Sequence, residues 1–194
     1  GRSSNSSNRI PGLDAGQESV PLPWENSPPP AFACLWTTGP DPKLDRVFRV
    51  LALRNVDGEW ETFDRWCVDG AEGAAVSSRM RLEFGVEASD LADATDADEV
   101  LAELRHFLEG SGVVSDDGER WLEMRAPGEP LPVTGITELA SLLAPGRLSL
   151  QGHGLVRGLG REPSTGPDRA LFPTELVEAA GALVERFSKA DLGA

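Results

Sequence analysis

The sequence contains few cysteines and no long apolar runs. Cys34 and Cys67 are the two cysteines among 194 residues, too few for a disulfide framework and not spaced as metal ligands. Both fall in strand-like segments, where a free cysteine is usually a small buried hydrophobe. No apolar run approaches the ~18 residues that cross a bilayer, and no charged-then-apolar N-terminal stretch indicates a secretory signal. These absences predict a reducing, cytoplasmic location and no membrane partner.

Positive charge is also scarce. The formal net charge is −14, from 32 acidic and 18 basic residues, and the lysines are Lys43 and Lys189. Proteins that bind nucleic acids gain much of their affinity by neutralising phosphates with Lys and Arg, so this balance predicts weak nucleic-acid binding or none. The candidate nucleic-acid contacts are the arginines concentrated in the first half of the expected domain: Arg46, Arg49, Arg54, Arg65, Arg79 and Arg81.

Length and composition fit one domain of ordinary size preceded by a tail. Hydrophobic residues make up 40% of the chain, which is enough for a core. Residues 1–30 are rich in Ser, Asn, Gly and Pro and have no apolar periodicity, which is typical of a disordered linker. Residues 31–194 are predicted to form the folded domain. The first residue is Gly1 rather than Met, which favours a piece of a longer protein.

Three strands are predicted at the start of the domain. Residues 31–36 form a short apolar run, and residues 46–56 are rich in Val and Leu. Asp57-Gly58 is a hairpin signal, and residues 59–68 are typical of the return strand. Strands joined this closely predict an antiparallel meander.

The second half of the chain changes to a helical period. A helix over 96–108 is predicted, with Thr95 as its cap and Asp98 completing a capping box. Short strands are expected at 112–115 and 131–134. Further helices are expected from residue 136 and over 149–160 and 173–189. This order predicts an α/β domain with a ribonuclease H-like mixed sheet, in which three antiparallel strands are followed by alternating helices and short parallel strands.

Three segments resemble motifs of the DnaQ-like (DEDDh) 3'–5' exonucleases. Residues 31–40, AFACLWTTGP, resemble the first motif, a strand with Asp-x-Glu followed by Thr-Thr-Gly, of which Thr37-Thr38-Gly39 is intact. Residues 113–122, VVSDDGERWL, resemble the second motif, and residues 168–171, DRAL, resemble the His-Arg-Ala-Leu of the third. The resemblance spans roughly residues 31–189 and implies the fold of that family.

The resemblance also implies that the family's catalytic positions have been replaced. Cys34 and Trp36 stand at the acidic positions of the first motif. Trp121 and Pro173 stand at the other two catalytic aspartates, and Asp168 stands at the general-base histidine. Two-metal hydrolysis needs converging carboxylates, and Mg²⁺ needs hard oxygen ligands. We therefore expect no catalytic residues, no bound metals or other cofactor, and a cleft partly filled by Trp36.

These expectations favour a chain that is not an enzyme: a catalytically inactive exonuclease domain that serves as a structural or protein-interaction module. Relatives of the family suggest a covalently linked or partner protein for DNA processing, such as a polymerase or helicase. One alternative is a nucleic-acid-binding module that does not cleave. Another is an active exonuclease with an atypical metal site. Acidic residues near the second and third motifs are interpreted as exposed loop charges: Asp116, Asp117, Glu119 and Asp168.

Overall fold

The computed structural model describes residues 30–70, 75–126, 128–160, 167 and 169–188. The predicted linker, apart from Pro30, lies outside these residues, as do Asp168 and Lys189. Among the residues described, no helix is both long and apolar enough to cross a membrane.

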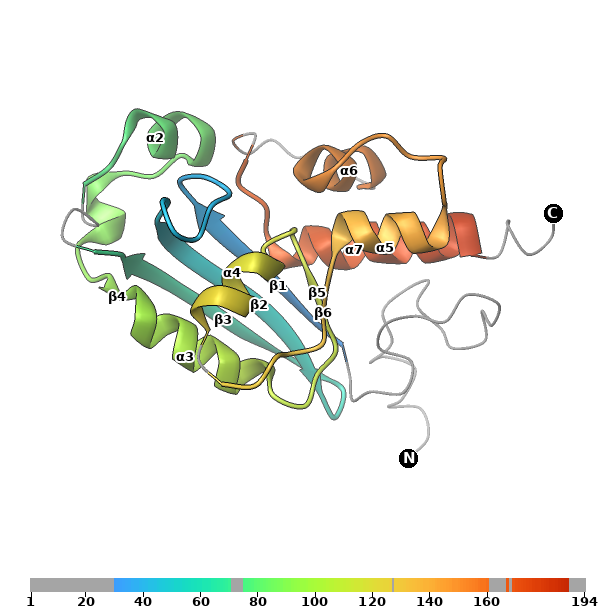
Figure 1. Ribbon diagram of the computed structural model, residues 1–194, viewed down its shortest axis with the longest axis horizontal. Coiled ribbons are helices and arrows are strands. Elements are labelled where there is room, and N and C mark those ends of the chain that lie inside the picture. Colours follow the sequence, from blue (N-terminus) through green and yellow to red (C-terminus); the bar gives the residue numbers. More distant parts are fainter. Residues whose placement is uncertain (1–29, 71–74, 127, 161–166, 168, 189–194) are drawn as a thin grey trace.

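A six-stranded mixed sheet forms the centre, in the order β4-β3-β2-β1-β5-β6 (Figure 1). The first three strands make the predicted antiparallel meander, with Asp57-Gly58 at its second turn. β5 pairs in parallel with both β1 and β6, and the short β4 pairs in parallel with β3. The bounds are β1 Ala31–Thr37, β2 Val47–Val56, β3 Glu59–Val68, β4 Thr95–Asp96, β5 Val113–Ser115 and β6 Val133–Gly135.

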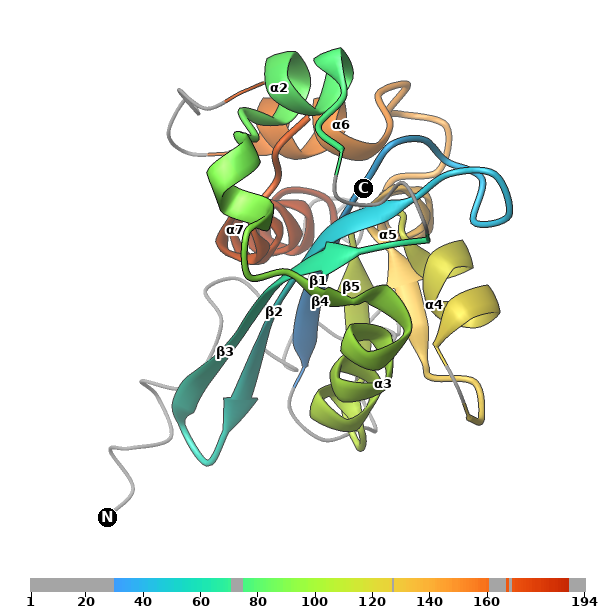
Figure 2. The same cartoon turned by 90° about the vertical axis from the view of Figure 1, so that its left-hand side faces the viewer.

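Helices cover both faces of the sheet (Figure 2). On one face lie α3 Ala97–Leu108 and α4 Glu119–Arg125. The other face carries four helices, which share a second apolar core: α2 Ser78–Phe84, α5 Ile136–Leu143, α6 Gly152–Leu159 and α7 Pro173–Leu183. Two shorter turns complete the described elements, a 3-10 turn at Ala88–Leu91 and a π-helical turn at Val184–Ser188.

Some predicted boundaries differ from the structure because tertiary contacts decide them. The cap of α3 is Asp96, whose carboxylate accepts hydrogen bonds from the backbone N–H groups of Asp98 and Glu99 at 3.1 and 3.3 Å. Thr95 instead pairs with Cys67 in the sheet, so the predicted Thr95 cap is wrong by one residue. A carboxylate at this end of a helix also interacts favourably with the helix dipole.

The sequence prediction missed α2 and α4, and placed three other elements imperfectly. Both missed helices have seven residues, too short for a clear apolar period. The predicted strand at 131–134 lies at Val133–Gly135, and the helix expected from residue 149 begins at Gly152. The terminal helix ends its regular α-helical part at Leu183 and continues as the π-helical turn.

Candidate functional site

Strand β1 divides its side chains between the two cores. Phe32, Cys34 and Trp36 face α2, α5, α6 and α7, whereas Ala31, Ala33 and Leu35 face α3 and α4. All six are buried. Alternation is the rule for a strand, so both first-motif positions, Cys34 and Trp36, point to the α7 side. The pairing register between β1 and β2 shifts between Trp36 and Thr37, at the end of the strand where the site lies.

Trp36 fills space on the α7 side of the sheet. Its side chain is 3% exposed, and its Nε1–H donates a 2.8 Å hydrogen bond to the backbone oxygen of Leu171. The indole makes edge or tilted ring contacts with Phe48, Trp66, Phe84 and Phe172 at centroid distances of 5.5 to 6.4 Å. A large aromatic side chain with its one polar atom satisfied suits a buried position.

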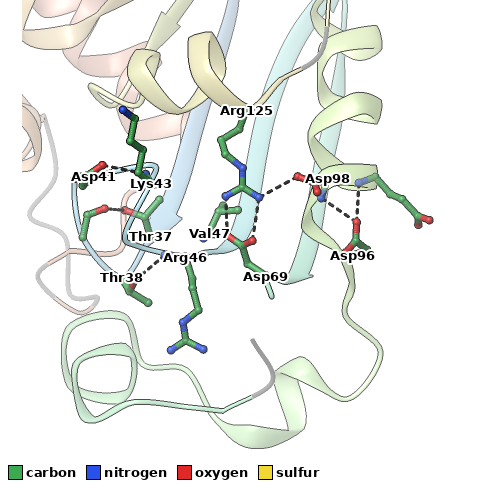
Figure 3. Close-up of polar contacts among 12 residues, drawn as sticks. Thr37, Thr38, Asp41, Lys43, Arg46, Val47, Asp69, Asp96, Asp98 and Arg125 are labelled. Carbon is green, nitrogen blue, oxygen red and sulfur yellow. Dashed lines mark hydrogen bonds and ion pairs between the residues drawn. The ribbon is translucent and has the colours of Figure 1, made fainter. Parts of the chain in front are cut away.

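The Thr-Thr-Gly segment shapes the loop that follows β1 (Figure 3). Thr37 Oγ1 donates to the Gly39 backbone oxygen at 2.8 Å, and Thr38 Oγ1 accepts from the Arg46 N–H at 2.9 Å. A Cβ at Gly39 would collide with the Asp45 carboxylate, which itself accepts from the Asp41 N–H at 3.0 Å. The intact part of the motif therefore has a structural role here: it closes the β1–β2 loop.

Asp116 joins the ends of β1 and β5. Its backbone N–H donates to the Ala33 oxygen at 3.2 Å, and its Oδ2 accepts from the Leu35 N–H at 3.0 Å. Its Oδ1 is shielded from solvent and has no hydrogen-bond partner. Burial raises the pKa of Asp116 to about 8, and the charges of Asp117 and Glu119 add to the shift. The prediction that Asp116 is an exposed loop charge is therefore wrong.

Asp117 ties the β5–α4 turn to two helices on the other side of the site. Its Oδ1 accepts from the Thr137 N–H at 3.0 Å, and its Oδ2 accepts from Thr137 Oγ1 at 2.5 Å. Thr137 Oγ1 also accepts from the Gly152 N–H at 2.9 Å. The φ of Asp117 is 71°, a left-handed conformation that is uncommon outside glycine. These hydrogen bonds stabilise it, and they make Asp117 a structural residue rather than a loop charge.

A pocket of about 670 Å³ opens between these segments, at the carboxyl ends of β1 and β5. Its walls come from the β1 end, α2, the β5–α4 turn, the start of α6 and the segment before α7. Asp116 and Asp117 line it together with apolar atoms of Leu35, Phe84 and Leu171. Trp36 is buried as expected, but it packs beside this pocket and does not line it, so the pocket stays open.

Arginine side chains line the same pocket: Arg79 from α2, Arg120 from α4 and Arg169 from the segment before α7. Arg79 pairs with Glu83 at 2.7 Å, and Arg169 Nη1 lies 3.1 Å from His153 Nδ1. Of these, sequence reasoning proposed only Arg79 as a contact residue. Arg120 lies within the second-motif segment and Arg169 within the third. Their position in those motifs is the sequence signal that could have identified them as residues of the site.

The other predicted contact arginines do not gather at the pocket. Arg49 pairs with Asp64 and stacks over Trp36 and Trp66. Arg54 pairs with Glu61, and Arg65 pairs with Glu103 of α3. Arg46 belongs to the β1–β2 loop, and Arg81 is exposed on α2. The set is thus divided between both sheet faces and α2, and most of its charges are compensated by carboxylates.

The side chains that the resemblance aligns with the family's catalytic positions do not suit divalent metal ions. Burial raises the pKa of the Cys34 thiol well above its usual value, with further contributions from Asp116 and Glu175, so the thiol is neutral. Trp121 is 3% exposed and packs in the core with α3. Pro173 is buried in the first turn of α7. None of these offers an oxygen ligand, and Trp36 uses its only polar atom elsewhere.

The described residues contain no group of three or more His, Cys, Asp or Glu side chains that could hold a metal ion. Asp168, which stands at the family's histidine, lies outside those residues. The expected absence of a metal stays a prediction.

Comparison with known proteins gives matches among solved structures. No protein-family model and no curated protein sequence matches the chain. The structure of E. coli exonuclease I in complex with a dT13 oligonucleotide has a TM-score of 0.55 and 14% identity, and the match covers 84% of this chain and 42% of that chain. Exonuclease X in complex with 5' overhanging duplex DNA has a TM-score of 0.52 and 14% identity, with 84% and 93% covered.

A third similar structure is that of a 3'-exonuclease that recognises the 3' end of a histone mRNA stem-loop. Its TM-score is 0.53 and its identity 11%, and the match covers 84% of this chain and 66% of that chain. This chain thus spans about two fifths of the exonuclease I chains and most of the exonuclease X chain. At these identities the similarity establishes the fold.

The comparisons correct one sequence-based conclusion. The prediction that the chain is not an enzyme is wrong as an inference from the motifs, because the solved structures that share its fold are exonucleases. Replacement of the family positions does not by itself exclude activity. The chain has the ribonuclease H-like fold of the DnaQ-like exonucleases.

Proposed function

We propose that this chain binds single-stranded nucleic acid and holds its 3'-terminal nucleotides in the arginine-lined pocket. The observation that carries the proposal is the place of that pocket, at the carboxyl ends of β1 and β5. In open α/β sheets, ligands bind outside the carboxyl ends of the strands. Arg79, Arg120 and Arg169 supply cationic side chains there. Structures of similar fold contain oligonucleotides, including dT13 and single-stranded DNA.

The net charge of −14 limits the strength of this binding. Long-range repulsion opposes a polyanion, so affinity must come from the few phosphates that the pocket arginines reach. Nucleic-acid affinity that depends on phosphate contacts falls with added salt. We therefore expect modest affinity with a shallow salt dependence, typical of few contacts, rather than the steep dependence of an extended basic surface.

Fluorescence anisotropy of 5'-labelled dT13 tests the proposal. Titration at salt concentrations from about 50 to about 200 mM should give saturable binding that weakens as salt rises. The same oligonucleotide closed into a circle has no 3' end and should bind less tightly. Absence of saturable binding at the lowest salt, or equal binding of the circle, would contradict the proposal.

Hydrolysis is a second candidate function, favoured by the similarity to exonucleases. Asp116 and Asp117 are the described carboxylates that line the pocket. A time course on 5'-labelled dT13 with Mg²⁺ or Mn²⁺, and with EDTA as control, measures it. Shortening from the 3' end that is lost in Asp116→Asn would support hydrolysis at this site. Shortening unaffected by that substitution, or no shortening at high protein concentration, would reject it and leave the binding proposal standing.

A further inference from the structure

Positive charge collects in the pocket although the chain as a whole is strongly acidic. Arg79, Arg120 and Arg169 line it with His153. Arg120 is exposed and makes no side-chain hydrogen bond or ion pair within the described part of the chain. A guanidinium presents five N–H donors in a planar fork that matches phosphate oxygens. An unpaired guanidinium at the mouth of a pocket is thus available to an anionic ligand.

The two carboxyl groups of the pocket, Asp116 and Asp117, repel a bound anion only weakly. Both oxygens of Asp117 accept hydrogen bonds from Thr137, so its charge is partly compensated by these donors and is outnumbered by the arginines of the pocket. Asp116 Oδ2 accepts from the Leu35 N–H, and Oδ1 is shielded from solvent. The raised pKa of Asp116, about 8 because of burial, leaves it largely neutral at neutral pH. The balance of charge in the pocket is therefore positive.

The same pocket is poorly suited to divalent cations. The strand positions beside it carry a buried neutral thiol, Cys34, and an indole, Trp36, whose N–H is already bonded. Neither is a ligand for a hard cation. The arginine side chains that line the pocket can neutralise a phosphate without a metal ion.

We propose that the pocket binds a phosphate monoester directly through Arg120 and Arg169, without a divalent metal ion. The monoester is carried either by a free nucleoside monophosphate or by the phosphorylated 3' end of a strand, since both present the same dianion. This inference rests on the proposed function, because it names the chemistry that the nucleic-acid site recognises. It also separates this chain from a site that holds phosphates through metals.

Competition against labelled dT13 in the presence of EDTA tests the inference. The competitors are thymidine 5'-monophosphate, thymidine and inorganic phosphate. We expect the monophosphate to compete at least about tenfold better than thymidine, as expected for loss of a charge-assisted hydrogen bond. Mg²⁺ in place of EDTA should leave the affinity unchanged. Equal competition by the nucleoside, or a need for Mg²⁺, would overturn the inference while leaving nucleic-acid binding intact.

Matched variants locate the contact. Arg120→Ala and Arg169→Ala should each weaken monophosphate binding about tenfold or more, and Arg81→Ala should leave it unchanged. Arg81 is a suitable control because it is exposed on α2 and does not line the pocket. Circular dichroism checks that each variant is folded. Equal effects of all three substitutions would overturn the assignment, because they would reflect only the change in net charge.

Two strands distinguish the sources of the phosphate. If the strand end is the natural ligand, dT13 with a 3'-phosphate binds tighter than dT13 with a 3'-hydroxyl, and Arg120→Ala removes the difference. If the free nucleotide is the ligand, calorimetry detects monophosphate binding while the 3'-phosphate adds nothing. Either result supports a phosphate monoester site. If neither the 3'-phosphate nor the free monophosphate shows binding to the pocket while dT13 still binds, the inference alone is overturned. If the monophosphate binds but dT13 does not, the proposed function alone is overturned.

Discussion

At the scale of single residues, Asp116 is the most unusual group in the site. Its Oδ2 accepts a hydrogen bond from the Leu35 N–H at the end of β1, and its Oδ1 is shielded from water without a hydrogen-bond partner. Charged carboxylates are costly to bury. Burial accordingly raises its pKa to about 8, far above the value of about 4 expected in an unfolded chain.

This shift predicts a pH dependence of stability with a definite sign. Between about pH 4 and about pH 8 the folded chain holds a proton on Asp116 that the unfolded chain releases. Stability contributed by this group therefore falls as pH rises through that window, and the penalty is fully present above it. Other titratable or charged groups lie close to Asp116 or line the same pocket, so the effect is isolated only by comparing a variant with the parent chain. They are Asp117, Glu119 and Cys34, which interact with Asp116, and Arg79, Arg120, His153 and Arg169 of the pocket.

Asp116→Asn should stabilise the protein at about pH 8 by on the order of 1–3 kcal/mol. The amide oxygen still accepts from the Leu35 N–H, and no charge has to be buried. At about pH 2.5, below both the folded and the unfolded pKa, the difference should vanish, since the carboxyl is then neutral in both states. Urea unfolding at the two pH values measures this. A variant as stable as, or less stable than, the parent at about pH 8 would contradict a raised pKa of Asp116 in the folded state.

Residue chemistry also shows why the site could be predicted only in part. The resemblance aligns Cys34 and Trp36 with the acidic positions of the first motif through their spacing to the Thr-Thr-Gly segment, and the structure places both side chains in the core beside the pocket. Sequence could not show that Asp117 would adopt a left-handed conformation and bond Thr137. That role depends on two segments twenty residues apart, and local patterns carry no information about such contacts.

At the scale of elements, the α4 helix is held in place by one arginine. Arg125 makes a two-bond contact with Asp69, at 2.9 Å for each bond, and a 3.0 Å bond with Asp98 of α3 (Figure 3). Asp69 also accepts from the Val47 N–H at 3.0 Å. The contact connects α4 with the ends of β2 and β3 and with α3, and α4 carries Arg120 and Trp121 of the site.

Arg125→Ala should destabilise the fold by about 2–3 kcal/mol, because it leaves Asp69 partly buried without its cation. Although burial acts to raise the pKa of Asp69, hydrogen bonds from Arg125 and the Val47 N–H lower it overall. The Arg125 contribution is present above about pH 4 and is lost as pH falls through the folded pKa. Thermal unfolding at about pH 7 and about pH 3 measures both effects.

Arg120→Ala serves as the control for that measurement. It removes an arginine from the same helix, but Arg120 is exposed and has no described partner. Its effect on stability should be within about 0.5 kcal/mol. Equal destabilisation by the two substitutions would show that Arg125 has no special role in positioning α4.

The elements themselves were predictable in proportion to their length and periodicity. The meander and α3 follow from alternation, a hairpin signal and a clear apolar face, and the structure agrees within one or two residues. The helices α2 and α4 were missed since each has two turns and a mixed face. Both line the pocket through Arg79, Phe84, Arg120 and Trp121, so part of the wall of the site lies on elements that the sequence did not predict.

At the scale of the whole molecule, the chain combines a nuclease fold with an acidic surface. Of the six arginines first considered as contacts, only Arg79 lines the pocket, and Arg49, Arg54 and Arg65 pair with carboxylates. The positive charge available to a ligand is therefore concentrated in the pocket. The protein-partner and larger-protein hypotheses stay predictions.

The most direct test of the central claim is a nuclear magnetic resonance titration of the ¹⁵N-labelled 20.7 kDa chain with dT13 in EDTA. We predict shifts at backbone amides around the pocket, at Gly118, Arg120, Gly152 and His153, and little change at Arg81 or at the distant β2–β3 turn. Arg120→Ala should weaken the response. Shifts confined to the β2–β3 sheet surface, or no shifts at saturating oligonucleotide, would contradict binding in the arginine-lined pocket.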